Sequence, residues 1–160
     1  MENNKTLFRN GVDLKRLAGT IRSVSADPAL GQFTFRLTNE WVDGGLNRSA
    51  IKGFYGGGKE DDTRTKSFIC ANDEPDILLG KDQAPNPVEY VLHALAGCLT
   101  TSLVYHAAAR GYVIEKVRSH FEGELDLRGL LGINGAPRNG YRQIRVRFDI
   151  QGNFTEEEKQ

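Results

Sequence analysis

The segment that most constrains this chain runs from Val88 to Arg110 and is rich in small and apolar side chains. Asn86 is a favourable N-cap residue, and Pro87 suits the first helical position, where its missing N–H is not needed. Arg110 followed by Gly111 is a common way for a helix to end. The pattern predicts one long helix over 88–110, which any fold of this chain must accommodate.

Cys98, in the middle of this helix, is the first candidate for chemistry. Residues three, four and seven positions away share its helix face, and they are small, hydroxylated or apolar: Val91, Ala94, Leu95, Thr101, Ser102 and Tyr105. A free cysteine in such surroundings is usually a packing residue. A reactive thiol would need a neighbouring cation, such as an arginine from elsewhere in the fold, to hold it as the thiolate. The residues alone leave both roles open.

The remaining chain alternates between strand and turn patterns. Period-two alternation predicts strands over 33–37, 65–71, 117–127 and 143–150, and Trp41 leads through a glycine turn into 49–54 as a hairpin. The last two strands are expected to be long, half-buried and antiparallel, joined by the Gly-rich loop 129–140. Residues 56–64 are predicted to form an exposed loop. An amphipathic helix is predicted over 14–24, capped by Asp13.

These elements predict an α+β fold in a single domain over residues 1–160. It divides into a helical extension (1–31), strands with a connector (32–87), the cysteine helix (88–110), an antiparallel hairpin (111–154) and the start of a helix (155–160). Thr155 and Glu158 have the spacing of a capping box, which opens a helix. Because the sequence stops at Gln160, we expect that the chain is truncated there.

The composition is that of a cytoplasmic protein without a nucleic-acid or membrane partner. Lys plus Arg and Asp plus Glu are equal at 21 each, so no basic excess suggests nucleic acid. No signal peptide is apparent, and no uninterrupted apolar run approaches the ~18 residues of a membrane span. The two cysteines are expected to be free thiols.

Other chemistries fit the residues less well. Residues 53–60 resemble a phosphate-binding loop, but Glu60 replaces the required hydroxyl, so a hairpin loop is expected. His93 and His106 lie about 140° apart around the helix and cannot share a metal ion unaided. We therefore expect no metal and no cofactor. Cys70 is expected in the core beside Phe68, and it could pair with Cys98 only if their Cα atoms lie within about 7 Å.

The segment Asn86-Pro-x-Glu-x-x-x-x-Ala-x-Ala-Gly-Cys98 resembles the OsmC/Ohr family, the osmotically inducible and organic-hydroperoxide-resistance proteins. Trp41 with its glycine-rich hairpin, the stretch 73–80 and the stretch 111–117 extend the resemblance along the chain. The resemblance implies an α+β fold in which strands curl around two long helices. It also implies that two chains intertwine as a homodimer, with sites at the interface.

The resemblance further implies a thiol peroxidase that reduces organic hydroperoxides. By motif position Cys98 matches the cysteine that attacks the peroxide, and the activating arginine would be Arg64 or Arg48 from the N-terminal strands. The neighbours of Cys98 on the helix would contact the substrate: Val91, Leu95, Ser102 and Tyr105. A second cysteine on a later helix would close a disulfide, which a dithiol reductant such as a lipoylated protein or thioredoxin would reopen.

Two departures from the family pattern favour an alternative. Val88 stands ten residues before the cysteine, where the family carries a carboxylate, and Glu89 lies about 180° from Cys98 around the helix. Glu89 is instead expected to pair with His93 or with solvent. No cysteine follows Cys98. The alternative is a non-catalytic OsmC-fold protein that binds a small apolar ligand at the dimer interface.

Overall fold

The structure is a computed structural model that describes residues 7–155 and 157–159. Its helices and strands form a mixed α+β architecture, as predicted. The chain divides into two compact units, Met1–Leu14 with Tyr90–Gln160, and Lys15–Glu89. Each unit is described by itself.

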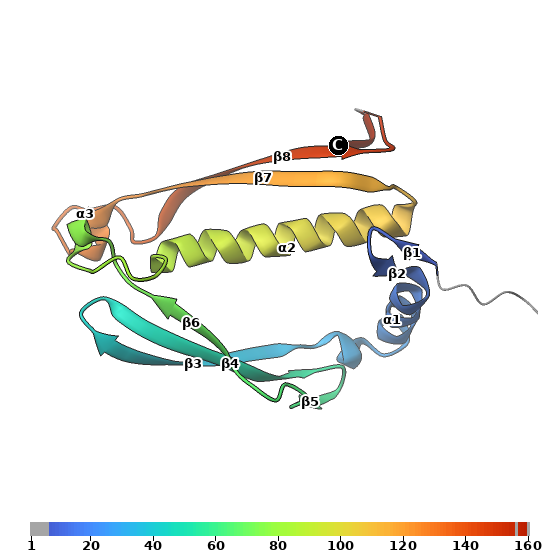
Figure 1. The fold of residues 1–160 in the computed structure, drawn as a ribbon, viewed down its shortest axis with the longest axis horizontal. Coiled ribbons are helices and arrows are strands. Elements are labelled where there is room, and N and C mark those ends of the chain that lie inside the picture. The colour runs from blue at the N-terminus through green and yellow to red at the C-terminus, as the bar shows by residue number, and fades with distance from the viewer. Residues whose placement is uncertain (1–6, 156, 160) are drawn as a thin grey trace, which may run out of the picture. The chain divides into compact units, whose positions relative to one another are not determined.

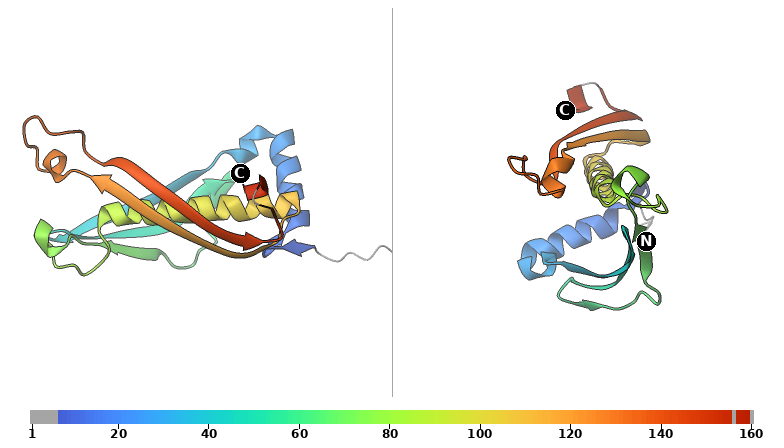
Figure 2. Two further views of the ribbon diagram at one scale, coloured as in Figure 1. Left: turned by 90° about the horizontal axis from the view of Figure 1, so that it is seen from above. Right: turned by 90° about the vertical axis from the view of Figure 1, so that its left-hand side faces the viewer.

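The first unit contains most of α2 (Pro87–Arg110) and the antiparallel strands β7 (Ile114–Leu125) and β8 (Tyr141–Gly152). The first residues of α2, up to Glu89, belong to the second unit. The helix lies along the hairpin, and the hairpin twists along its length (Figures 1 and 2). Side chains along β7 alternate between half-buried and exposed, and the rings of Phe121 and Phe148 meet edge to face at 6.3 Å. The predicted pair of long strands is confirmed.

Both ends of α2 are closed by local hydrogen bonds. Asn86 Oδ1 accepts from Val88 N at 2.9 Å, and Glu89 Oε2 accepts from Asn86 N at 2.9 Å, which together form a capping box. At the other end Gly111 has a φ of 96° and Tyr112 N donates to Ala107 O at 2.9 Å, as in a Schellman motif. The predicted helix is confirmed. Glu89 does not pair with His93, because its carboxylate serves the cap.

A small N-terminal hairpin closes over the end of α2. It consists of β1 (Phe8–Arg9) and β2 (Val12–Asp13). Arg9 Nη1 donates to Ala108 O at 3.2 Å. Asn10 Nδ2 donates to Tyr112 O at 3.1 Å, while Asn10 Oδ1 accepts from Ile114 N at 2.9 Å. In the described part of the extension this hairpin precedes α1 (Leu14–Ala26), which confirms the helix predicted over 14–24.

The sheet of the second unit is built around one central strand. After η1 (Pro28–Gly31), the strands are β3 (Thr34–Asp43), β4 (Leu46–Gly56), β5 (Lys59–Asp61) and β6 (Phe68–Asn72). One edge of β4 pairs with β3, and the other pairs with β5 and β6. The predicted exposed loop over 56–64 is partly wrong, because the chain turns at Gly57 and Gly58, which have φ of 60° and 82°, and returns as β5. The phosphate-loop-like residues 53–60 are thus a hairpin, as expected.

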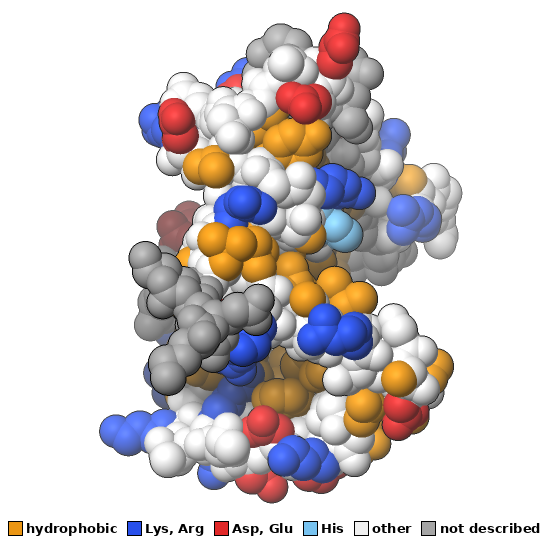
Figure 3. Space-filling model, turned by 90° about the vertical axis from the view of Figure 1, so that its right-hand side faces the viewer, with side chains coloured by type: hydrophobic (Ala, Val, Ile, Leu, Met, Phe, Trp, Pro, Cys, Tyr) orange, Lys and Arg blue, Asp and Glu red, His pale blue; other side chains and the backbone are white. Residues whose placement is uncertain are grey.

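One face of this sheet is apolar and largely uncovered. Leu37 lies opposite Ile51 and Phe35 opposite Phe54, so these four side chains share a face. The rings of Phe35 and Phe54 lie 5.3 Å apart. Phe35 is 69% exposed and Trp41 is 74% exposed. More generally, hydrophobic side chains reach the surface among charged ones on the face drawn in Figure 3.

The connector before α2 is organised by a single buried carboxylate. Asp73 is 1% exposed, and its oxygens accept from Glu74 N at 2.8 Å, Gln83 N at 3.1 Å and Lys81 N at 3.3 Å. The hydrogen bond from Gln83, followed by those from Glu74 and Lys81, lowers the pKa of Asp73 against the opposing effect of burial. The loop closes over η2 (Asp76–Leu78). The sequence alone predicts only a connector here.

Near the C-terminus the structure differs from one prediction and confirms another. The alternation was predicted through Leu127, but β7 ends at Leu125 because Asp126 Oδ1 accepts from Arg128 N at 3.0 Å and caps α3 (Leu127–Leu130). The Thr155–Glu158 capping box is present, with Glu158 Oε2 accepting from Thr155 N at 2.8 Å. It precedes η3 (Glu157–Lys159). Glu156 and Gln160, within the predicted helix start, lie outside the described residues.

Candidate functional site

The thiol of Cys98 lies on an exposed face of α2. On the same face Val91 is 52% exposed and Tyr105 is 50% exposed. Ser102 is also exposed, whereas Leu95 is half-buried. By helical spacing these side chains share the face of Cys98, where they present apolar and hydroxyl groups, and Cys98 itself is exposed. Within this chain, a small molecule can therefore approach Cys98.

Arg64 is held by two aromatic rings in the second unit. Its guanidinium carbon lies 5.2 Å from the ring centre of Phe54 and 5.3 Å from that of Phe68. Nη1 donates to Lys52 O at 2.7 Å. The cation–π contacts and this hydrogen bond fix the group against the apolar face of the sheet. A guanidinium group has five N–H donors. In Arg64 one of them, on Nη1, is used in the hydrogen bond to Lys52 O.

Arg48 occupies the opposite face of the same sheet. It is paired in register with Glu40 on β3 and Ala71 on β6, while the next residue, Ser49, lies opposite Cys70. Because successive strand residues point to opposite faces, Arg48 points away from the face that carries Phe68 and Cys70. Cys98 belongs to the first unit and both arginines to the second.

Cys70 is half-buried on β6, two residues after Phe68, and it is a free thiol. Sequence reasoning expected a core residue, and the sheet face around Cys70 carries exposed apolar side chains instead. Cys70 shares that face with Phe68, against which Arg64 stacks.

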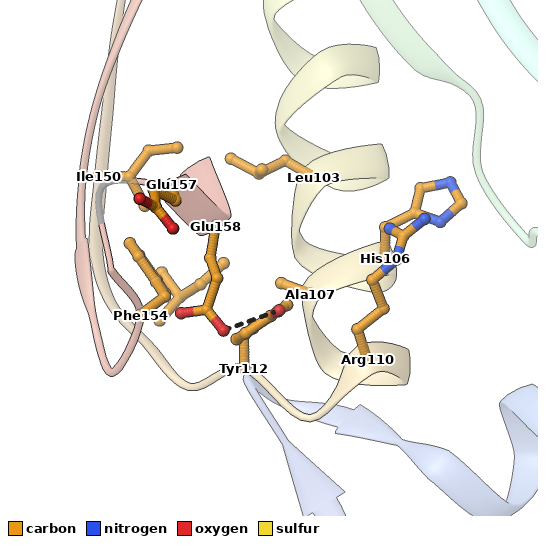
Figure 4. Close-up of a pocket in the computed structure, with 10 residues that line it drawn as sticks. Leu103, His106, Ala107, Arg110, Tyr112, Ile150, Phe154, Glu157 and Glu158 are labelled. Carbon is orange, nitrogen blue, oxygen red and sulfur yellow. Dashed lines mark hydrogen bonds between the residues drawn. The ribbon is translucent and has the colours of Figure 1, made fainter. Parts of the chain in front are cut away.

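A cavity of about 460 Å³ lies in the first unit, between α2, the β7–β8 hairpin and the C-terminal segment (Figure 4). It is lined by Leu103, His106, Ala107, Arg110, Tyr112, Ile114, Ile150, Phe154, Glu157 and Glu158. The four α2 residues follow helical spacing and share one face. Leu103 is five residues after Cys98, about 140° around the helix, so the cavity opens on a different face from the thiol.

Hydrogen bonds fix the acidic side of this cavity. Tyr112 donates its O–H to Glu158 Oε1 at 3.2 Å, and this hydrogen bond to a carboxylate raises the pKa of Tyr112. The bond from Thr155 N, with smaller help from the hydroxyls of Thr155 and Tyr112, lowers the pKa of Glu158 despite desolvation. The Phe154 ring meets Tyr112 edge-on at 6.2 Å. Both oxygens of Glu158 are thus engaged within the protein.

Sequence reasoning did not identify this cavity. The available signals were the spacing of Leu103, His106, Ala107 and Arg110 on one helix face, and the Thr155–Glu158 capping box. Neither signal shows that the C-terminal segment turns back toward Tyr112. In the part of the chain that the structure describes, no group of three or more His, Cys, Asp or Glu side chains is placed to hold a metal ion.

Two comparisons with known proteins bear on these residues. The family model described as OsmC-like protein matches residues 80–160, just over half of the chain, and includes Cys98, α2 and the hairpin. A search of curated proteins gives no match. Arg48 and Arg64 precede the matched segment. The matched residues form the cysteine helix and the antiparallel hairpin of an α+β fold, and the chain therefore belongs to the OsmC-like protein family.

Proposed function

We propose that this protein is a thiol-dependent peroxidase that reduces organic hydroperoxides through Cys98. The observation that carries the proposal is the exposed thiol on α2 within the segment that matches the family. The thiolate sulfur attacks the terminal oxygen of the hydroperoxide, so that an S–O bond forms and the O–O bond breaks. The alkoxide leaves as the alcohol after taking up a proton, and Cys98 becomes a sulfenic acid.

An external dithiol completes the cycle in this proposal. One of its thiols attacks the sulfenic sulfur and releases water, and its second thiol displaces Cys98 from the mixed disulfide. The oxidised dithiol leaves and Cys98 returns to the thiol. The apolar and hydroxyl groups beside the sulfur, from Val91, Leu95, Ser102 and Tyr105, suit an organic substrate with an apolar body.

Arg64 is the better of the two candidate activators. Its guanidinium is stacked on Phe54 and Phe68 at the apolar sheet face, whereas Arg48 lies on the other face. A pre-oriented guanidinium favours the thiolate over the thiol and stabilises charge that develops on the peroxide oxygen. We assign this role to Arg64, in the same chain or in a second copy.

Trapping the sulfenic acid tests the proposal directly. The protein is treated with cumene hydroperoxide and then with dimedone, which reacts with sulfenic acids. Mass spectrometry should then show one added dimedone on the peptide that contains Cys98. We expect Arg64→Gln to slow this labelling by about 10- to 100-fold, because the cation is lost. Arg48→Gln should change it by less than about 2-fold. Absence of an adduct on Cys98 in the wild-type protein would refute the peroxidase.

We further propose that the protein is a cytoplasmic homodimer. Phe35 and Trp41 are exposed on its apolar sheet face, and contiguous exposed apolar side chains are typical of interaction surfaces. α2 is long and apolar enough to cross a membrane by length and composition only, and a single helix of this kind is weak evidence for a membrane span. Proteins of this family are generally soluble.

Sedimentation equilibrium should give twice the mass of one chain at micromolar concentration. Phe35→Glu, on the apolar face of β3, should raise the dissociation constant of the dimer by more than about 10-fold. Thr38→Glu adds the same charge on the opposite face of β3 and is the matched control. A monomeric wild-type protein at this concentration would contradict the homodimer.

A second candidate function is non-catalytic binding of a small apolar ligand at the dimer interface. It is favoured by Val88 at the position where the family pattern has a carboxylate, together with the use of Glu89 in the helix cap. This candidate predicts that Cys98 remains a thiol after peroxide treatment, while an apolar ligand is retained by the purified dimer in native mass spectrometry.

A further inference from the structure

The cavity at the C-terminal end of α2 has the size of a small-molecule site and lies away from the thiol. Its volume of about 460 Å³ falls within the range of known ligand pockets, about 300 to 1,000 Å³. Leu103, Ala107, Ile114, Ile150 and Phe154 give it apolar walls. The thiol chemistry proposed for Cys98 makes no use of any of these residues.

The polar groups of the cavity are of two kinds, and Figure 4 shows them on different elements. Glu157 and Glu158 belong to the C-terminal segment, whereas His106 and Arg110 lie one turn apart on α2. Glu158 already accepts hydrogen bonds from Thr155 and Tyr112. Among the described residues, neither His106 nor Arg110 has a hydrogen bond or an ion pair. The uncommitted donors therefore lie on the helix side.

The end of α2 would ordinarily repel an anion, because its last carbonyl groups carry partial negative charge. Here local donors occupy these groups. Ala107 O accepts from Tyr112 N at 2.9 Å, and Ala108 O accepts from Arg9 Nη1 at 3.2 Å. The residue Tyr112 after the helix and Arg9 of the N-terminal hairpin thus each satisfy one of these carbonyl groups, which removes part of the opposing field and leaves Arg110 as a cation at the rim.

We propose that this cavity binds an aliphatic monocarboxylate. Its carboxylate contacts Arg110 and His106, and its alkyl chain lies against Leu103, Ala107, Ile150 and Phe154. A guanidinium can donate two parallel hydrogen bonds to a carboxylate, which gives both orientation and affinity. Glu157 and Glu158, on the acidic side of the cavity, both oppose the binding of an anion. The site is separate from Cys98, so the binding does not depend on the peroxidase.

Titration calorimetry with octanoate tests the proposal in the full chain. We expect saturable binding, weakened at least about 10-fold by Arg110→Gln through loss of a charge-assisted contact. Arg118→Gln removes the same charge from the exposed face of β7 and should change the affinity by less than about 2-fold. Glu157→Gln should strengthen binding about 2-fold by removing a like charge. Cys98→Ser should bind octanoate as the wild type does, even where the thiol chemistry is lost.

Octylammonium has an alkyl chain of the same kind as octanoate but the opposite charge, and it is the ligand control. Octanoate should bind more tightly, and it should shift the amide resonances of Ala107 and Ile150 in the wild-type protein. The proposal fails if octanoate shows no saturable binding or if octylammonium binds at least as tightly. It also fails if Arg118→Gln weakens binding as much as Arg110→Gln. Because the resonance shifts are measured on wild-type protein, the test stands even where a variant does not fold.

Discussion

Cys98→Ser should lower the second-order rate constant for cumene hydroperoxide reduction by about 10³-fold or more. The reaction needs a thiolate, and a serine hydroxyl in the same place is neither ionised near neutral pH nor able to take part in disulfide exchange with a dithiol. The measurement is peroxide loss with a dithiol such as dihydrolipoamide in excess. Substitution on an exposed face of α2 should leave the thermal midpoint within a few degrees.

Cys70→Ser is the matched control, since it makes the same change of sulfur to oxygen on β6. It should retain the wild-type rate within about 3-fold, because the proposed cycle resolves the sulfenic acid with an external thiol. A Cys98→Ser protein that keeps a tenth or more of the rate would end the peroxidase proposal. A large loss in Cys70→Ser would instead make Cys70 a participant in the reaction.

Asp73→Ala should lower the thermal midpoint by about 10 °C or more, the largest stability effect expected from one substitution in the connector. The carboxylate is 1% exposed and accepts three backbone N–H groups from residues up to ten positions away. Removing it leaves these donors without a partner and frees the segment that leads into α2. Asp76→Ala, in the exposed turn of the same loop, is the control and should cost at most a few degrees.

The effect of Asp73 should also depend on pH. Because the folded protein holds the pKa of Asp73 below its ordinary value, the ionised carboxylate stabilises the fold above the unfolded pKa of about 3.9. That contribution is lost as the pH falls below this value and through the lower folded pKa. The stability difference between wild type and Asp73→Asn should therefore be constant near neutral pH and shrink below about pH 4. A difference that does not change with pH would contradict the role of the charge.

The elements that local residue patterns determine were predictable from the sequence. Asn86, Pro87 and Gly111 define the ends of α2 because caps depend on neighbouring residues. The alternation along β7 and β8 predicts their half-buried faces because a strand has a period of two. For the candidate site, the motif singled out Cys98 as the residue to test. The family match then covers the segment that contains it.

What could not be predicted depends on contacts between residues distant in sequence. The buried position of Asp73 follows from backbone N–H groups that its loop brings back to it, and a carboxylate in a connector does not indicate this. Arg64 and Arg48 are equivalent by sequence spacing. The sheet register separates them, because Phe54 and Phe68 come from different strands and meet Arg64 on only one face. The cavity beside Tyr112 likewise needs the return of the C-terminal segment.

The N-terminal hairpin also affects the order in which the protein can fold during synthesis. Arg9 and Asn10 bond to groups 99 to 104 residues further along the chain. At about 5 to 20 residues per second, their partners are made on the order of 5 to 20 s after these two residues. The second unit, Lys15–Glu89, is complete before that moment. Arg9 and Asn10 are therefore made early and find these partners late.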